Sequence, residues 1–294
     1  MKVNLIKEKT MGTLTSKKDK TKFYGHYYKQ YTADKQKVFG IIPGIAEEGG
    51  TLQVITDKKA YNFTFPTAEM GDTIKVGNSE FTNDYMKVDL PDIKGELHFS
   101  DTTPIAYDFM GFLKYLPLED RHSIISIRHR TMGKITVEGE EYDFDNGYGY
   151  HECDSGEQFP AAHMWIQCNS FDDPDDTAIV ACIAQVPVLG IPVRGSIVVI
   201  NRKGHKENRL STYFLALTSL KKDKITLWQF PNRKFVIDVL DEGTAHGLVS
   251  ASNGNMTEEL REANNAHCRF RYYKSGKLQF DLESEHVGYE RRHL

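Results

Sequence analysis

The sequence predicts an all-β protein, and three observations support this fold class. Short runs of alternating apolar and polar residues recur along the chain, turn-forming residues separate them, and helical periodicity is scarce. Many short strands with few short helices are typical of β-barrels or sandwiches rather than of βαβ units. The 294 residues exceed what one hydrophobic core usually organises, so we expect two domains.

The clearest strand pair lies near the C-terminus, around the turn Lys274-Ser275-Gly276. Apolar residues alternate with polar ones on both sides of this turn, which predicts an antiparallel hairpin with one buried face. The alternating apolar residues are Cys268, Phe270, Tyr272, Leu278, Phe280 and Leu282. Similar runs predict further strands over 52–55, 124–127, 135–137, 197–200, 225–228 and 235–239.

Two segments fit the strand pattern less well. Residues 256–266 are the best candidate for a helix, with Asn255 as the N-cap and Glu258 three residues later. Residues 104–117 are rich in aromatics and fit neither period. This second segment is expected either to cover a binding pocket as a lid, with Gly111 as its flexible point, or to plug one end of a barrel.

A weak internal repeat predicts where the two halves meet. An aromatic strand, an apolar run ending near a proline and a β-branched strand occur in that order over 25–55 and again over 164–200. The repeat places the boundary between Tyr150 and Ala162. We therefore expect an N-terminal domain over 1–155 and a C-terminal domain over 156–294.

Charge and cysteine content restrict the partners and the compartment. Charged residues make up 27% of the chain and the net charge is −4, which argues against a surface for nucleic acid or for anionic membranes, because both need clustered Lys and Arg. No signal-peptide core is visible near the N-terminus, and no apolar run is long enough to span a membrane. The four cysteines form no CxxC pair, so we expect a reducing, cytoplasmic environment.

The segment 142–169 resembles the signature of the tocopherol cyclase family. In that family a Gly-x-Gly-Tyr stretch leads into Glu-Lys-Asn/Asp-Trp-Gly-x-x-Phe-Pro and then Trp-x-Trp-x-Gln-x-Asn. The matching residues are Gly147, Gly149, Tyr150, Glu152, Asp154, Gly156, Phe159, Pro160, Trp165, Gln167 and Asn169. Residues 23–29 and 110–129 resemble two further family blocks, so the resemblance covers about two-thirds of the chain.

The resemblance implies two lipocalin-like β-barrel halves packed together, as in carotenoid hydratases, with a hydrophobic ligand at or near their junction. The family's reaction closes a chromanol ring on a prenylated hydroquinone without a metal or a redox cofactor, so no cofactor is expected. Such a reaction needs a proton donor for the prenyl double bond, an acceptor for the phenol proton and an apolar wall around the developing cation.

Several positions depart from the family pattern. Cys153 stands where the family has Lys, and Ser155 and His163 stand where it has Trp. On the first strand, His26 replaces a Trp and Tyr24 replaces a Glu. Polar groups in place of aromatic ones predict a ligand that is smaller or more polar than a long-chain prenyl quinol.

The first candidate site follows from alternation along an extended 148–154 segment. One side then carries Tyr148, Tyr150, Glu152 and Asp154, and the other carries His151 and Cys153. Two carboxylates this close hold one proton between them, because like charges raise one pKa. Glu152 or Asp154 is therefore a candidate proton donor. The alternative is that both carboxylates accept structural hydrogen bonds from backbone groups or Arg.

The next strand presents a second set of candidate residues on one face, namely His163, Trp165, Gln167 and Asn169. An aromatic ring beside amides is typical of a pocket wall in which a few polar groups orient an apolar ligand. The alternative is a core tryptophan with amides that satisfy turn backbone. His163 is a candidate acid or base at a position where the family has Trp, with a structural histidine as the alternative.

Two further sets of residues are of types that occur in proton relays or metal sites. Glu119 and His122 match family positions and predict a proton relay, with a hydrogen-bonded turn at the strand entry as the alternative. Metal-ligating residue types also occur at His151, Cys153, Asp154 and His163. Alternation divides this second set between two faces, and its spacing matches no zinc pattern, so no metal site is expected.

Two functional hypotheses follow. The first is an enzyme that cyclises or isomerises a prenylated aromatic or terpenoid by acid catalysis, supported by Glu152, Asp154 and the Trp165–Asn169 strand. The second is a non-catalytic, lipocalin-like carrier of an apolar ligand, supported by the departures at residues 153, 155 and 163.

Overall fold

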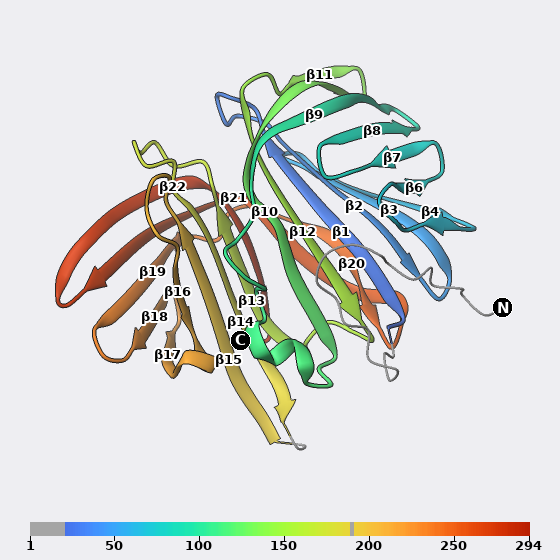
Figure 1. The fold of residues 1–294 in the computed structure, drawn as a ribbon. Helices are drawn as coiled ribbons and strands as arrows, with labels where there is room; N and C mark the ends of the chain where they lie inside the picture. Colours follow the sequence, from blue (N-terminus) through green and yellow to red (C-terminus); the bar gives the residue numbers. More distant parts are fainter. Residues whose placement is uncertain (1–20, 189–190) are drawn as a thin grey trace. The chain divides into compact units, whose positions relative to one another are not determined.

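Antiparallel strands make up almost all of the regular secondary structure in the described residues, as expected from the alternating sequence pattern (Figure 1). The structure is a computed structural model that describes residues 21–188 and 191–294. Within these ranges the helical elements are two 3-10 helices, η1 (Gly111–Tyr115) and η2 (Thr212–Phe214). The expectation about a signal peptide falls on residues 1–20, which lie outside the described residues.

The chain divides into two compact units, and each is assembled from three separate segments. Unit 1 contains the described residues up to Thr103, then Glu119–Phe159 and Leu248–Glu259. Unit 2 contains Pro104–Leu118, Pro160–Gly247 and Leu260–Leu294. The chain therefore passes between the units several times.

Unit 1 is built on a nearly closed antiparallel sheet in which β1 and β12 are central neighbours. The described strands follow the order β4-β3-β2-β1-β12-β10-β9-β8-β7-β6-β5, with β11 paired to β10. Their bounds are β1 Phe23–Tyr31, β2 Val38–Ala46, β3 Gly49–Thr56, β4 Ala60–Phe65, β5 Ala68–Glu69, β6 Ile74–Val76, β7 Ser79–Phe81, β8 Tyr85–Leu90, β9 Ile93–Thr103, β10 Asp120–Val137, β11 Glu140–Asp143 and β12 Gly147–Gly156.

The core of unit 1 lies on one face of this curved sheet. Side chains from nearly every strand meet there, including Tyr28, Phe39, Leu52, Phe81, Leu97 and Phe144. Because successive strand residues point to opposite faces, the residues between them point away from this core.

Unit 2 is built on a second antiparallel sheet, with the order β16-β15-β14-β13-β22-β21-β19-β18-β17 and β20 paired to β21. The bounds are β13 Ala162–Cys168, β14 Ala178–Val188, β15 Ile191–Asn201, β16 Asn208–Ser211, β17 Ala216–Lys221, β18 Lys224–Gln229, β19 Arg233–Asp241, β20 Ala245–Ser252, β21 Asn255–Lys274 and β22 Lys277–Arg292. The tip of the β20–β21 hairpin belongs to unit 1.

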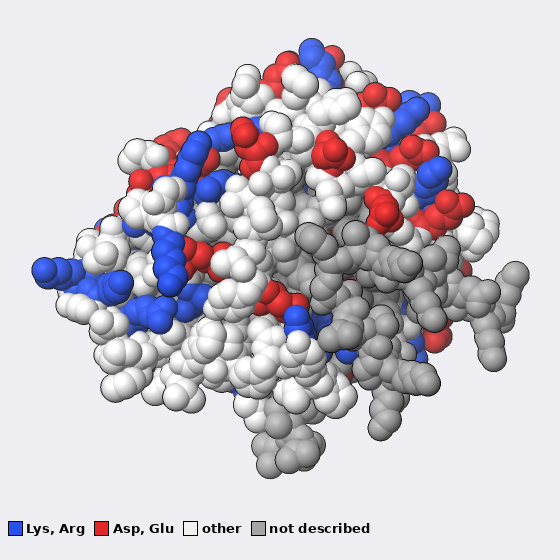
Figure 2. Space-filling model, in the orientation of Figure 1, with Lys and Arg blue, Asp and Glu red and all other residues white. Residues whose placement is uncertain are grey.

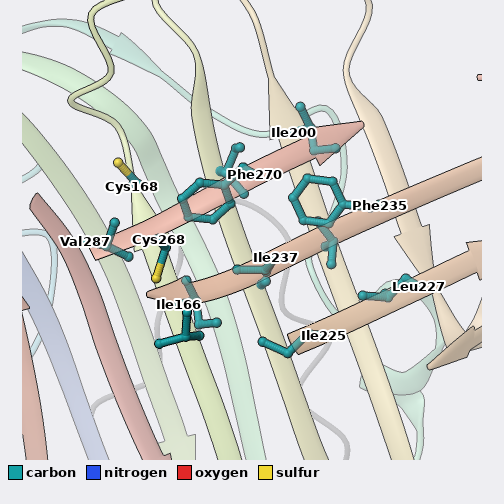
Figure 3. Packing of buried hydrophobic residues seen from close by; sticks show 14 of the residues in the cluster. Ile166, Cys168, Ile200, Ile225, Leu227, Phe235, Ile237, Cys268, Phe270 and Val287 are labelled. Atoms are coloured by element: carbon teal, nitrogen blue, oxygen red, sulfur yellow. The ribbon is translucent and has the colours of Figure 1, made fainter. Parts of the chain in front are cut away.

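The core of unit 2 is aliphatic and aromatic (Figure 3). Ile166 and Cys168 of β13 point into it, and Phe270 of β21 packs on Phe235 of β19 with ring centroids 6.4 Å apart. The other face of β13 therefore presents the intervening residues, Trp165 and Gln167. This alternation matches the prediction for the strand.

The predicted C-terminal hairpin is confirmed. Phe270 lies opposite Leu282, and Tyr272 lies opposite Phe280. The turn uses left-handed backbone at Ser275 and Gly276, with φ of 50° and 74°, which suits the twist of a tight hairpin.

The predicted helix over 256–266 is wrong, because these residues belong to β21. Residues 262 and 263 pair with β22, and register shifts follow between Ala263 and Ala266 and between Ala266 and Cys268. These irregularities break the period of two, so buried residues occur at spacings that imitate a helix.

No helix in the described ranges is long and apolar enough to cross a membrane. All four cysteines are free thiols.

Candidate functional site

Strand pairing in unit 1 brings a histidine and two acidic residues together. Asp154 on β12 lies opposite His122 on β10, and Glu152 lies opposite Ile124. Residues directly opposite in an antiparallel pair share a face. The side chains of His122, Glu152 and Asp154 therefore meet on the sheet face that points away from the unit 1 core.

His122 lies between the two carboxylates. Its Nδ1 is 2.7 Å from Asp154 Oδ1, and its Nε2 is 3.3 Å from Glu152 Oε2. The exposed side-chain fractions are 12% for His122, 7% for Glu152 and 16% for Asp154. An imidazole with a carboxylate at each ring nitrogen has the geometry of a doubly protonated, charged ring.

The charges around His122 stabilise that protonated form. Burial alone disfavours the imidazolium, but the charges of Asp154 and Glu152 and the hydrogen bond to Asp154 outweigh it and raise the pKa of His122 to about 10. The cluster therefore holds a proton on His122 at neutral pH.

Tyr150 and Asp120 extend the cluster along the same face. The Tyr150 hydroxyl donates a short hydrogen bond to Glu152 Oε2. Burial, followed by the charge of Asp154, raises the pKa of Asp120 well above its ordinary value. Asp120 therefore binds a proton more tightly than an isolated aspartate does.

The opposite face of the same strands carries a separate set of histidines, on the core side of unit 1. His26 Nδ1 is 2.8 Å from His151 Nε2, and the His151 ring stacks on Tyr28 with centroids 3.9 Å apart. His129 Nε2 lies 3.1 Å from Gln30 Oε1. The prediction that residue 151 faces away from Glu152 and Asp154 is thus seen in the structure.

Tyr148 and Glu119 occupy different positions from the acidic cluster. Tyr148 lies further along β12, where Lys35 and Arg130 approach its ring at 5.5 and 4.7 Å. The backbone carbonyl of Glu119 accepts hydrogen bonds from the amides of residues 157 and 158 at 2.8 and 3.4 Å. Glu119 thus takes part in a turn at the entry to β10.

The second predicted set lies in unit 2, on the face of β13 that points away from the core. His163 Nδ1 donates to the Pro160 carbonyl at 2.8 Å, and its Nε2 makes a short contact with the Glu290 carboxylate. Burial opposes charging of this ring, but the charge and hydrogen bond of Glu290 prevail and raise the pKa of His163. His163 is therefore a second histidine held toward its charged form.

Gln167 and its neighbours complete this face. Gln167 is fully buried, and neither its amide nitrogen nor its amide oxygen has a hydrogen-bond partner among the described residues. Trp165 and Asn169 are also buried, with 7% and 2% of their surfaces exposed. A buried amide without partners is costly, and a polar ligand group would satisfy it.

A metal ion is compatible with the spacing of the unit 1 cluster but not with its arrangement. One ligand atom from each of His122, Glu152 and Asp154 lies within 4.8 Å of the others. However, both ring nitrogens of His122 face carboxylates, and a metal would need one of them deprotonated and free. The residues fit a shared proton better than a metal.

Sequence reasoning missed Asp120 and Glu290. Asp120 lies two residues before His122 on an extended strand, so alternation alone would have placed both on one face. Glu290 gave no comparable signal, because its proximity to His163 depends on the pairing of β13 with β22, which are more than a hundred residues apart.

Comparisons with known proteins agree with this fold. The family model described as tocopherol cyclase-like matches residues 24–218. Kievitone hydratase from Nectria haematococca superposes with a TM-score of 0.53 at 10% identity, covering 93% of this chain and 89% of the hydratase. CghA, solved with Sch210972, superposes with a TM-score of 0.57 at 8% identity, covering 92% and 88%.

At such low identity the two solved structures support the fold alone. No curated protein matches the sequence. The family model, in contrast, spans well over half of the chain, including β1, β10, β12 and β13, which carry most of the site residues; Glu290 on β22 lies outside the matched range. The chain belongs to the tocopherol cyclase-like family.

Proposed function

We propose that this protein binds a hydrophobic small molecule, a prenylated aromatic or another terpenoid, and catalyses its acid-assisted cyclisation or isomerisation. The observation that carries the proposal is His122, a protonated imidazole between Asp154 and Glu152. A proton held on nearly buried groups is what the first step of such a reaction requires.

In the proposed first step, the proton of His122 crosses the 2.7 Å contact from Nδ1 to Asp154, and Asp154 delivers it to the double bond of the prenyl group. His122 is then neutral, and Asp154 is again a carboxylate. Protonation creates a tertiary carbocation, which the negative charge of Glu152 stabilises electrostatically. His122 and Glu152 are thus assigned to proton supply and to cation stabilisation.

The second step closes the ring. The phenol oxygen attacks the carbocation, a C–O bond forms, and the phenol proton passes to the carboxylate of Glu152 or Asp154. One proton is donated and one is recovered, so the reaction is an isomerisation that needs no oxidant or reductant. Addition of water to a double bond can begin with the same proton transfer, and a hydratase is among the solved structures with this fold.

The residues of unit 2 are assigned to ligand binding and to a second proton. Gln167, whose amide has no partner among the described residues, would hydrogen-bond an oxygen of the ligand, and Trp165 would pack against its apolar part. His163, held charged by Glu290, is proposed as a second acid. Tyr148 and Asn169 remain candidate ligand contacts.

A non-catalytic carrier is the second candidate, and the unpartnered amide of Gln167 supports binding under either hypothesis. An experiment that distinguishes the enzyme from the carrier presents the protein with prenylated hydroquinones of several chain lengths. Fluorescence then measures binding, and mass spectrometry detects products. We expect turnover that falls at least about a hundredfold in Asp154→Asn while binding changes little.

Glu141→Gln is the matched control, because its side chain is 57% exposed and lies on β11 of the same unit. We expect that variant to retain full turnover. Stoichiometric binding without any product from the wild-type protein would support the carrier and contradict the proposed catalysis.

A further inference from the structure

Unit 2 presents an exposed apolar surface that the proposed chemistry does not use. Among the described residues, all the exposed large hydrophobics except Met132 belong to unit 2. Six of them define what we call the apolar tip, and they lie on η1, η2, β17, β18 and the adjoining turns. They are Phe112, Phe214, Leu215, Leu217, Trp228 and Phe230.

The apolar tip is continuous. The Phe112 ring lies 5.9 Å from the ring of Tyr213, which in turn lies 4.7 Å from that of Phe214. Leu217 on β17 is the direct cross-strand partner of Trp228 on β18. Phe214 and Leu217 are separated by only two residues, so the aromatic and aliphatic parts adjoin.

These side chains project into solvent. Leu215 is 78% exposed and Phe230 is 84% exposed. Leu215 adopts left-handed backbone, with φ of 61°, a conformation that a leucine rarely takes. This conformation lies between η2 and β17, in the middle of the apolar tip.

The segment that carries η1 is fastened to the rest of unit 2. The buried guanidinium of Arg209 donates to the backbone carbonyls of Tyr107 and Asp108 at 2.8 and 2.6 Å and stacks on the Tyr107 ring at 3.6 Å. The Tyr213 hydroxyl donates to the Phe109 carbonyl at 3.1 Å. The position of the segment leading into η1 is therefore fixed by contacts within unit 2.

The local charge indicates what covers the apolar tip. Residues 212–234 contain five Lys or Arg residues and one Asp, a net charge of +4 in a chain whose net charge is −4. Lys221 and Lys224 form the pair at the turn end of the β17–β18 hairpin, and Leu217 and Trp228 form a pair near its other end. Figure 2 shows uncharged side chains over this part of unit 2, with Lys and Arg gathered beside them.

We propose that the apolar tip docks on the surface of an anionic lipid bilayer. Exposed Phe, Leu and Trp side chains insert between headgroups, and Lys and Arg contact lipid phosphates, as in interfacial membrane anchors. The net charge of the whole chain argues against such a surface, but the charge of this segment has the opposite sign. The proposal does not depend on the catalytic assignment.

The test is co-flotation of the full chain with phosphatidylcholine vesicles and with vesicles that also contain phosphatidylserine. We expect binding to the anionic vesicles that weakens as salt is added. Replacing Leu215 and Phe230 together by Ser should reduce the partition coefficient by about tenfold or more. The matched control is Met132→Ser with Leu278→Ser, two side chains that are 60% and 51% exposed outside the apolar tip.

Three results would overturn the proposal. The first is that the wild type does not bind anionic vesicles, and the second is that the Leu215/Phe230 variant binds them as well as the wild type does. The third is that the wild type binds no vesicles and sediments as a dimer, whereas the Leu215/Phe230 variant sediments as a monomer. The last result would identify a second copy of the chain as the occupant. Because both side chains are exposed, circular dichroism of the variant should match the wild type.

Discussion

At the scale of single residues, His122 has the most constrained environment in the candidate site. Both its ring nitrogens face carboxylates, and its pKa is raised to about 10 from an ordinary value of 6.5. A histidine whose folded pKa is raised binds its proton more tightly in the folded state. Its contribution to stability is therefore complete below pH 6.5 and is lost as the pH rises through 10.

The first prediction concerns this loss of stability at alkaline pH. The unfolding free energy of the wild type should fall by about 4 kcal/mol between pH 6.5 and 10, and His122→Gln should largely remove that slope. Urea unfolding at a series of pH values measures it. His98→Gln, at an exposed histidine of β9, is the control and should keep the wild-type slope. An unchanged slope in His122→Gln would show that His122 is not the buried proton carrier.

The second prediction concerns Gln167, whose buried amide has no partner among the described residues. Replacing it by Leu removes an unsatisfied polar group of similar size, so Gln167→Leu should stabilise the ligand-free protein by ~1–2 kcal/mol. The same change should weaken ligand binding. Chemical denaturation and a binding titration measure the two effects. A destabilised variant would show that the amide has structural partners.

The candidate residues could be predicted from sequence only where the information is local. Alternation along β12 placed Glu152 and Asp154 on one face and His151 on the other, as the structure shows. Glu290 was out of reach, because its contact with His163 requires the pairing of two distant strands. Alternation also placed Tyr148 on the face of Glu152 and Asp154, but it could not indicate that the Tyr148 ring lies beside Lys35 and Arg130.

At the scale of elements, β1, β10 and β12 carry different chemistry on their two faces. One face holds the charged His122 cluster, and the core side holds neutral histidines. Burial lowers the pKa of His26 to about 4 and that of His129 to about 3, and burial also lowers the pKa of His151. Their folded pKa values lie below the unfolded value, so charging them opposes folding.

The third prediction follows from these neutral histidines. Stability should be complete above pH 6.5 and should decrease as the pH falls from 6.5 toward 4, by about 2–3 kcal/mol for His26 alone. The double variant His26→Phe with His151→Phe should show a shallower decrease, because neither ring can then be charged. Thermal unfolding across this pH range measures it, with His98→Phe as the exposed control. A decrease as steep as that of the wild type would contradict the assignment.

The fourth prediction concerns Gly149 of β12, which packs closely against His129 and Gln30 on the core side of unit 1. A Cβ atom there would lie 1.9 Å from His129 Nε2 and 2.3 Å from Gln30 Oε1. Gly149→Ala should therefore destabilise the protein by roughly 1–3 kcal/mol. Gly25→Ala on β1 is the control, because its nearest contact would be an ordinary 3.6 Å. Equal midpoints in urea for the two variants would contradict this account of the packing.

Strand irregularities explain the principal error in predicting the elements. Strict alternation identified the β21–β22 hairpin near its turn, where the pairing is regular. Further along β21, register shifts near Ala263 and Ala266 change the spacing of buried residues. A capping pattern at Asn255 then favoured a helix, because local propensity contains no information about the neighbouring strands.

At the scale of the whole molecule, the sequence predicted an all-β chain of the tocopherol cyclase-like family, and both are confirmed. The assembly of each unit from three segments could not be predicted, because it depends on contacts between residues far apart in the sequence. The tip of the β20–β21 hairpin, for example, belongs to unit 1 and is held there by the side chain of Gln53, which exchanges two 2.7 Å hydrogen bonds with the backbone of Val249.

Acid catalysis by the whole protein is tested most directly by turnover in heavy water. If the protein protonates a prenyl double bond, each molecule of cyclised product formed in D2O carries one deuterium at the carbon that received the proton, and mass spectrometry detects it. We predict this single label in wild-type product and strongly reduced product from Asp154→Asn. Product without the label would contradict proton donation to the double bond as the first step.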